Sequence, residues 1–218
     1  MTNLVFLEPN KIGAVPFTTS DIIAQYAGVS YRSVQRLIEK HEKALGAFGR
    51  VRFEITPLQT KGGVQNSKVY HLNEEQATLL ITFLKNTETV VAFKVELVKQ
   101  FYLMKSELLQ RQIYRQELKP IRRELTDTIR DRPDSGKWDY KLYTDLSYRA
   151  VLGKAAVKIR KERGAASKAK AVEYLTAAEI KAVTKVQGQI AVLIDMGLDY
   201  EEIKGMLLKR QALQGAAS

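Results

Sequence analysis

Cysteine is absent from this chain of 218 residues, and its absence excludes several kinds of site. No disulfide can form, and neither a zinc site with thiolate ligands nor an iron–sulfur cluster can be built. A chain without cysteine also suits a reducing compartment, so we expect a cytoplasmic protein.

Long apolar runs are also missing, and none approaches the length needed to span a membrane. The opening residues, MTNLVFLEPNK, lack the basic start, apolar run and small-residue cleavage site of a secretory signal. We therefore expect no association with a membrane. The hydrophobic fraction of 45% is ordinary and predicts a packed core.

Catalytic patterns are scarce. His41 and His71 are the only histidines, and neither has the spacing of a metal ligand or a triad member. The residues Pro133, Asp134, Asp139 and Lys141 spell PD followed by DxK, a pattern in which two carboxylates hold Mg²⁺ in nucleases. The gap is very short and no strands flank it, so a linker followed by a helix start is the better interpretation. We expect no enzyme activity, no metal and no cofactor.

Positive charge is abundant, with 35 Lys and Arg against 24 Asp and Glu and a formal net charge of +11. Such a balance favours polyanionic partners, nucleic acid first. The segment from Arg149 to Lys170 holds eight cations and a single acid, Glu162. The sequence leaves open whether this segment is a solvated helix face or a second phosphate-contacting surface.

The most informative stretch, residues 20–39, predicts a helix-turn-helix. Ala24 is small where two helices would cross, and Gly28 can adopt the left-handed conformation that ends the first helix. Ser30 can cap the second helix. Apolar contacts that fix the angle between the helices would come from Ile23, Val29, Val34 and Leu37. The alternative is a helical hairpin that only packs.

A predicted wing follows the helix-turn-helix. Residues 50–55 alternate, with Val51, Phe53 and Ile55 on one face, and predict a half-buried strand that ends at Pro57. A basic glycine loop at residues 61–63 leads to a return strand at residues 68–72. The expected DNA contacts on the second helix and wing are Ser30, Tyr31, Arg32, Ser33, Gln35, Arg36, Arg50, Arg52, Lys61 and Lys68.

The remaining chain predicts helices. Asn73 and Gln76 form a capping-box pattern, and a break at Asn86 and Thr87 precedes a long helix from about Glu88. Two apolar stripes on that helix suggest burial on two sides, against the winged helix and a second subunit, so a homodimer is a hypothesis. The stripes are Val91, Val95, Val98 and Tyr102, and Phe93, Leu97, Phe101 and Met104.

Pro120 is expected to limit or kink the long helix, and the polar stretch at residues 132–137 is the predicted domain boundary. Residues 1–132 would form a winged helix-turn-helix domain with a long helix, and residues 133–218 a small basic helical domain. Thr176 with Glu179 predicts a second capping box. The predicted fold class is mainly α with a small β-hairpin wing, or α+β.

From Thr18 to Leu108 the chain resembles the phage regulatory protein Rha family. The resemblance rests on TTSDIIAQYAGVSYRSVQRLIEKH, VYHLNEEQATLLITFLKNT and VAFKVELVKQFYLMKSEL. The matching positions are Tyr70, Leu72, Asn86, Thr87, Phe93, Lys94, Phe101, Tyr102 and Met104. The segment that begins YTDLSYRAVLG is similar, more loosely, to a C-terminal module of phage antirepressor-like and Rha-like proteins.

The resemblance implies a phage or prophage regulator that works in the cytoplasm of a bacterial host, and it brings no catalytic residues. Together with the helix-turn-helix, it predicts a transcriptional regulator that binds double-stranded DNA. The alternative is an antirepressor, which would bind a phage repressor protein and inactivate it. The sequence leaves the operator and the sign of regulation open.

Overall fold

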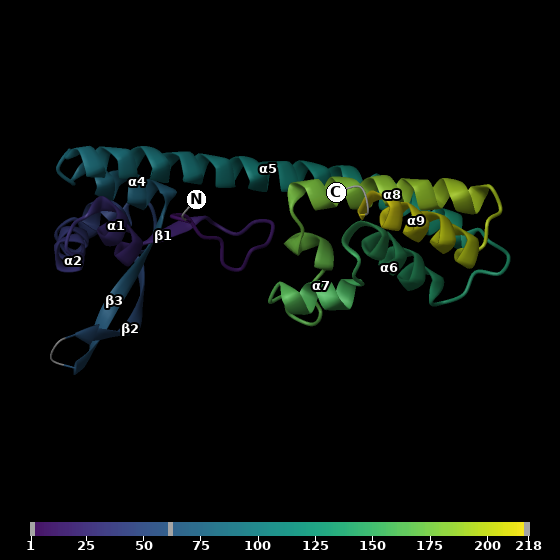
Figure 1. Cartoon of the computed structure of the whole chain (residues 1–218), viewed down its shortest axis with the longest axis horizontal. Helices are drawn as coiled ribbons and strands as arrows, with labels where there is room; N and C mark the ends of the chain where they lie inside the picture. The colour runs from purple at the N-terminus through teal and green to yellow at the C-terminus, as the bar shows by residue number, and fades with distance from the viewer. Residues whose placement is uncertain (1–2, 61–62, 216–218) are drawn as a thin grey trace. The chain divides into compact units, whose positions relative to one another are not determined.

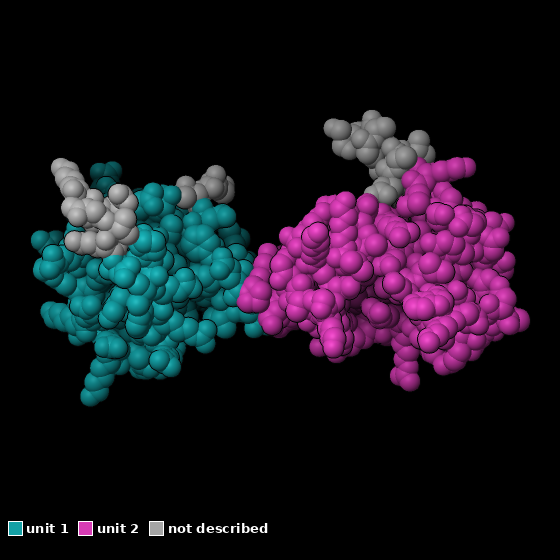
Figure 2. Space-filling view, turned by 90° about the horizontal axis from the view of Figure 1, so that it is seen from below, with its two compact units in different colours: residues 1–8, 13–106 teal, residues 9–12, 107–218 magenta. Residues whose placement is uncertain are grey.

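The computed structural model describes residues 3–60 and 63–215. It divides into two compact units, coloured separately in Figure 2. Unit 1 comprises residues 1–8 and 13–106, and unit 2 comprises residues 9–12 and 107–218. The helix α5 (Glu88–Arg130) contributes residues to both units. None of the helices in the described ranges is long and apolar enough to cross a membrane.

Unit 1 is a winged helix-turn-helix with a three-stranded antiparallel sheet in the order β1-β3-β2 (Figure 1). Its elements before α5 are β1 (Phe17–Thr19), α1 (Ser20–Ala27), α2 (Tyr31–Lys40), α3 (Glu42–Gly46), β2 (Arg52–Thr60), β3 (Gly63–Asn73) and α4 (Glu74–Thr82). The mainly helical fold with a β wing is thus as predicted. The strand β1 was not expected, because three residues are too few to show alternation.

The wing differs from its prediction in two respects. Pro57 does not end the strand, because β2 continues to Thr60 with Pro57 opposite Asn66. The sheet tolerates this proline because β2 is an edge strand. The strand is also not half-buried: Phe53 and Ile55 are 47% and 64% exposed, since the β2–β3 hairpin extends away from the helices (Figure 1).

The core of unit 1 joins the helix-turn-helix to the first part of α5. Phe93, Leu97 and Phe101 on α5 are buried, as are Ile23, Val34, Ile38, Leu72 and Leu80 on the other elements. The second predicted stripe behaves differently, because Val91, Val95 and Val98 are 44%, 49% and 49% exposed. Only one of the two stripes is therefore buried within this chain.

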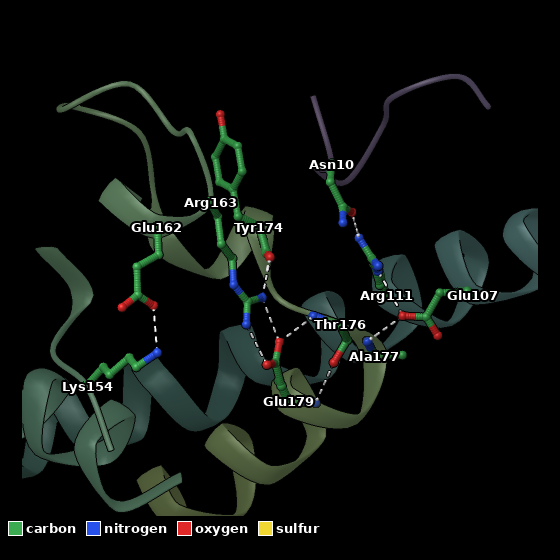
Figure 3. A network of polar contacts seen from close by, with 10 residues as sticks. All are labelled: Asn10, Glu107, Arg111, Lys154, Glu162, Arg163, Tyr174, Thr176, Ala177 and Glu179. Atoms are coloured by element: carbon green, nitrogen blue, oxygen red, sulfur yellow. Dashed lines mark hydrogen bonds and ion pairs between the residues drawn. The ribbon is translucent and has the colours of Figure 1, made fainter. Parts of the chain in front are cut away.

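Unit 2 is entirely helical in the described residues. It contains the rest of α5 with α6 (Asp139–Leu152), α7 (Ala156–Glu162), the 3₁₀ helix η1 (Ala171–Tyr174), α8 (Ala177–Asp195) and α9 (Tyr200–Gly215). The predicted capping box at Thr176 and Glu179 is present. Residues 9–12 contact this unit: Asn10 accepts a hydrogen bond from Arg111 at 2.7 Å (Figure 3), and the N–H of Ile12 donates to the carbonyl of Glu173 at 2.8 Å.

Pro120 does not limit α5, which continues to Arg130. A proline inside a helix costs about 3 kcal/mol, but Leu118, Leu125 and Ile129 on the same helix are buried in unit 2. Their burial offsets this cost. The compact units consequently divide inside α5, between residues 106 and 107, and the polar stretch at residues 132–137 joins two helices of unit 2.

Candidate nucleic-acid interface

The turn between α1 and α2 has the predicted geometry. Gly28 has φ 65° and ψ 31°, the left-handed conformation, and its N–H bonds the carbonyl of Ala24. Ser30 then caps α2, because its side-chain oxygen accepts a hydrogen bond from the N–H of Ser33 at 3.1 Å. These local contacts end one helix and begin the next within three residues, which sets the direction of α2.

One face of α2 is fixed in the core and the opposite face is free. Val34 and Ile38 are 0% and 1% exposed. Arg32 and Arg36 lie one turn apart on the other side of the helix and are exposed. Among the residues that the structure describes, neither forms an ion pair. Arg32 and Arg36 are therefore both exposed on the same side of α2.

Tyr31 and Gln35 have a different position from the one expected. The Tyr31 hydroxyl donates a hydrogen bond to the main-chain carbonyl of Lys68 on β3. The Gln35 amide donates to the same carbonyl at 3.0 Å and lies 3.3 Å from the hydroxyl oxygen of Ser67. These two side chains connect α2 to the wing. Because their donors are used within the chain, we do not assign them the base contacts that the sequence suggested.

Further contacts tie the same strand to the helices. Ser20, which is fully buried, accepts a hydrogen bond from the N–H of Tyr70 on β3 at 3.0 Å. The Tyr70 hydroxyl donates to Glu39 at 3.4 Å. Burial and the negative charge of Glu39 both raise the pKa of Tyr70. The wing and α2 thus form one connected surface.

The loop before the wing is held by the cap of α4. Asn73 and Gln76 form the predicted capping box. The Asn73 amide also donates to the carbonyl of Phe48, and the Gln76 amide donates to the carbonyl of Gly49, both at 2.8 Å. These bonds position the segment that carries Arg50, which is exposed and lies just before β2.

The remaining predicted cations lie on the wing. Arg52 is exposed in β2, and Lys68 is exposed in β3 with its ammonium 4.9 Å from the centre of the Phe53 ring. This cation–π contact keeps the lysine on the hairpin surface.

Lys61 lies outside the described residues. Ser33 is exposed, but its hydroxyl bonds that of the capping Ser30 at 2.7 Å.

Sequence reasoning missed one member of this surface, Lys40. It continues the spacing of Arg32 and Arg36 by one further helical turn, is exposed, and forms no ion pair within the described ranges. The i, i+4, i+8 spacing was the signal that could have identified it. Together the helix and the wing present cations and few acids, an arrangement suited to a phosphate backbone.

The two histidines and the nuclease-like residues have local partners. His41 stacks on Phe83, and His71 stacks on Phe17 and lies 3.5 Å from Glu54 across the β2–β3 pair. Asp134 bonds Arg132, and Asp139 accepts a hydrogen bond from the N–H of Gly136 at 2.9 Å. No cluster of three or more potential metal ligands occurs in the part of the chain that the structure describes.

Residues 18–106 match the family model of phage regulatory protein Rha. This part of the chain is Rha-like. The match begins in β1 and ends at the last residue of unit 1, so the Rha-like segment contains the helix-turn-helix, the wing and the first part of α5. It indicates a phage regulator. No curated protein matches the chain, and the resemblance of residues 143–207 to an antirepressor module stays a hypothesis.

Proposed function

We propose that this protein is a phage or prophage transcriptional regulator of the bacterial cytoplasm that binds double-stranded DNA through α2. The observation that supports this function best is the pair Arg32 and Arg36, which are exposed on the face of α2 opposite Val34 and Ile38 and form no ion pair with any described residue. A helix-turn-helix presents this face to the major groove. The match of residues 18–106 to the family model of phage regulatory protein Rha supports a regulatory role.

The chemistry of each group gives it a role. A guanidinium group donates two parallel hydrogen bonds to O6 and N7 of guanine, and such a contact discriminates between bases by about 1–3 kcal/mol. Arg32 and Arg36 would read bases in this way. Lys40, Arg52 and Lys68 would contact phosphates, which strengthens binding to every sequence equally. Tyr31 and Gln35 would act indirectly, by keeping the wing at a fixed position beside α2.

The test begins with selection of a preferred site from genomic DNA by the full chain. Arg36→Ala is then compared with the unchanged protein on the selected site and on random DNA. We expect affinity for the selected site to fall by about 5- to 150-fold, the equivalent of 1–3 kcal/mol, and affinity for random DNA to fall much less. Lys99→Ala is the matched control, because Lys99 is an exposed cation of unit 1 on α5. Equal losses on both DNAs would refute base reading by α2.

We also propose that the regulator is a homodimer through α5. Val91, Val95, Val98 and Tyr102 form an exposed apolar stripe with the alternating three- and four-residue spacing of a coiled-coil seam. A dimer would let two α2 helices bind the two halves of a palindromic site. Light scattering tests this proposal, and a monomer at micromolar concentration would refute it.

An antirepressor is the second candidate function. A specific observation favours it: unit 2 has an apolar groove of about 440 Å³ lined by Val192, Leu193, Met206 and Leu207, from α8 and α9. Val192 and Met206 are 55% and 54% exposed, so a partner's apolar side chain could reach them. Co-purification with a phage repressor, together with no retention on DNA at low salt, would favour this function over the first.

A further inference from the structure

A second cationic site lies in unit 2, far along the sequence from the helix-turn-helix. It is a cleft of about 620 Å³ bordered by α5, α6, α7 and the residues that lead into η1. Six cations line it: Arg115, Lys119, Arg122, Lys141, Arg160 and Lys170. Asp145 is the one carboxylate in the lining.

The cations of the cleft are not neutralised within the described residues. None of the six forms an ion pair there. Asp145 accepts a hydrogen bond from the N–H of Ala156 at 3.0 Å and so helps to start α7. Two neighbouring cations outside the cleft are paired instead: Lys154 with Glu162 at 2.7 Å and Arg163 with Glu179 at 2.6 Å (Figure 3). The cleft thus brings six cations without a described ion pair around one space.

The floor of the cleft is apolar. Leu125, Ile129 and Val172 are almost fully buried, and Tyr140 is half-buried at the edge. Tyr148 is also buried, and burial raises its pKa although the charges of Arg122 and Arg115 oppose this. A cationic rim over an apolar floor suits a ligand that has both a multiply charged and a flat apolar part.

We propose that this cleft binds a ligand that carries several phosphate groups. Its volume lies within the range of about 300–1,000 Å³ typical of small-molecule sites. Cations from four separate segments line one space, so several of them can contact the phosphate oxygens of one ligand. The phosphates come either from a free nucleotide or from the backbone of a nucleic-acid strand. The site is independent of DNA binding by α2.

Isothermal titration calorimetry at low salt tests the proposal with three probes: inorganic tripolyphosphate, ATP and a short oligothymidylate. The cleft variant is Lys119→Gln with Arg160→Gln and Lys170→Gln in the full chain. The matched control loses the same charge from exposed residues of unit 2 outside the cleft lining, by Lys158→Gln, Lys161→Gln and Lys185→Gln. The oligothymidylate titrations use a background in which Arg32, Arg36, Lys40, Arg52 and Lys68 are all changed to alanine, so that the proposed contacts of α2 and the wing do not contribute.

We expect at least one probe to bind saturably to the unchanged protein. Its affinity should fall at least about tenfold in the cleft variant and stay within about twofold of the unchanged protein's in the control. Preference for ATP identifies a free nucleotide, and binding of oligothymidylate alone identifies a strand backbone. The probe that binds should also raise the melting temperature of the unchanged protein but not that of the cleft variant. No saturable binding of any probe, or equal weakening in both variants, would overturn the proposal.

Discussion

The ion pair between Arg163 and Glu179 makes the sharpest prediction about unit 2, because it connects α7, η1 and α8. The two guanidinium nitrogens of Arg163 donate to the two Glu179 oxygens at 2.7 and 2.6 Å, and one of them also donates to the carbonyl of Tyr174 at 2.6 Å (Figure 3). Glu179 in addition accepts from the N–H of Thr176 at 2.7 Å. We predict that Arg163→Met destabilises unit 2, although methionine retains most of the aliphatic stem.

The magnitude follows from the exposure of the pair. The side chains of Arg163 and Glu179 are 31% and 22% exposed, between a surface pair and a buried one. Surface pairs contribute about 0–1 kcal/mol, whereas loss of one partner of a buried pair costs about 3–5 kcal/mol. We therefore expect Arg163→Met to lower the free energy of unfolding by about 2–3 kcal/mol.

The pair also predicts a dependence on pH. Burial alone would raise the pKa of Glu179, but hydrogen bonds from Arg163 and Thr176 outweigh it, and the pKa is lowered from 4.5. A carboxyl whose pKa is lower in the folded state stabilises that state above its unfolded pKa and loses this effect as the pH falls through the folded pKa. The advantage of the unchanged protein over Glu179→Gln should therefore be complete at neutral pH, begin to decline near pH 4.5 and be lost as the pH falls through the lower pKa of the folded state.

Urea unfolding followed by tryptophan fluorescence is the assay, because the only tryptophan, Trp138, lies in unit 2. The matched control is Lys154→Met, which removes the more exposed pair with Glu162, with side chains 41% and 42% exposed. We expect this control to change stability by less than about 1 kcal/mol. The reasoning is refuted if Arg163→Met costs no more than the control, or if the difference between the unchanged protein and Glu179→Gln persists in acid.

Three further predictions concern unit 1. Lys68→Ala should weaken binding to specific and random DNA alike and reduce the salt slope by about one, as measured by titration at several salt concentrations; a loss confined to one sequence would contradict a phosphate contact. Gly28→Ala should lower the free energy of unfolding in urea by about 1–2 kcal/mol, because alanine is strained at φ 65°. Steric overlap is not the cause, since the added Cβ would lie 3.8 Å from Thr89. The control Gly205→Ala, at a helical position with free space around it, should not destabilise the protein. Asn73→Ala should lower the melting temperature through a loss of about 1–2 kcal/mol, since the cap of α4 and the bond to Phe48 both disappear; an unchanged melting temperature would show that the cap contributes nothing.

The sequence predicted well wherever a structure depends on neighbouring residues. The turn at Gly28, the cap by Ser30 and the capping boxes at Asn73 and Thr176 all involve contacts within four residues. Of the apolar contacts predicted between the two helices, Ile23 and Val34 are buried, whereas Val29 and Leu37 are half-buried. Such features can be predicted from a sequence because the interactions that stabilise them join residues close together in the chain.

Predictions that needed a distant partner were wrong or incomplete. Pro57 was expected to end its strand and Pro120 to limit or kink the long helix, but β2 continues beside β3 to Thr60 and α5 continues to Arg130, supported by buried leucines. The roles of Tyr31 and Gln35 changed because both reach a carbonyl on β3, more than thirty residues away. Short local patterns contain no information on such pairings.

The sequence by itself determined that the chain has a helix-turn-helix, which residues cap its helices, and that it is rich in positive charge. Only the tertiary structure decided how that charge is distributed. It gathered cations between Arg115 and Lys170 around one cleft, and it left Arg163 paired with a carboxylate nearby. Charge is a property of each residue, but whether a charge is neutralised depends on what folding brings within a few ångströms of it.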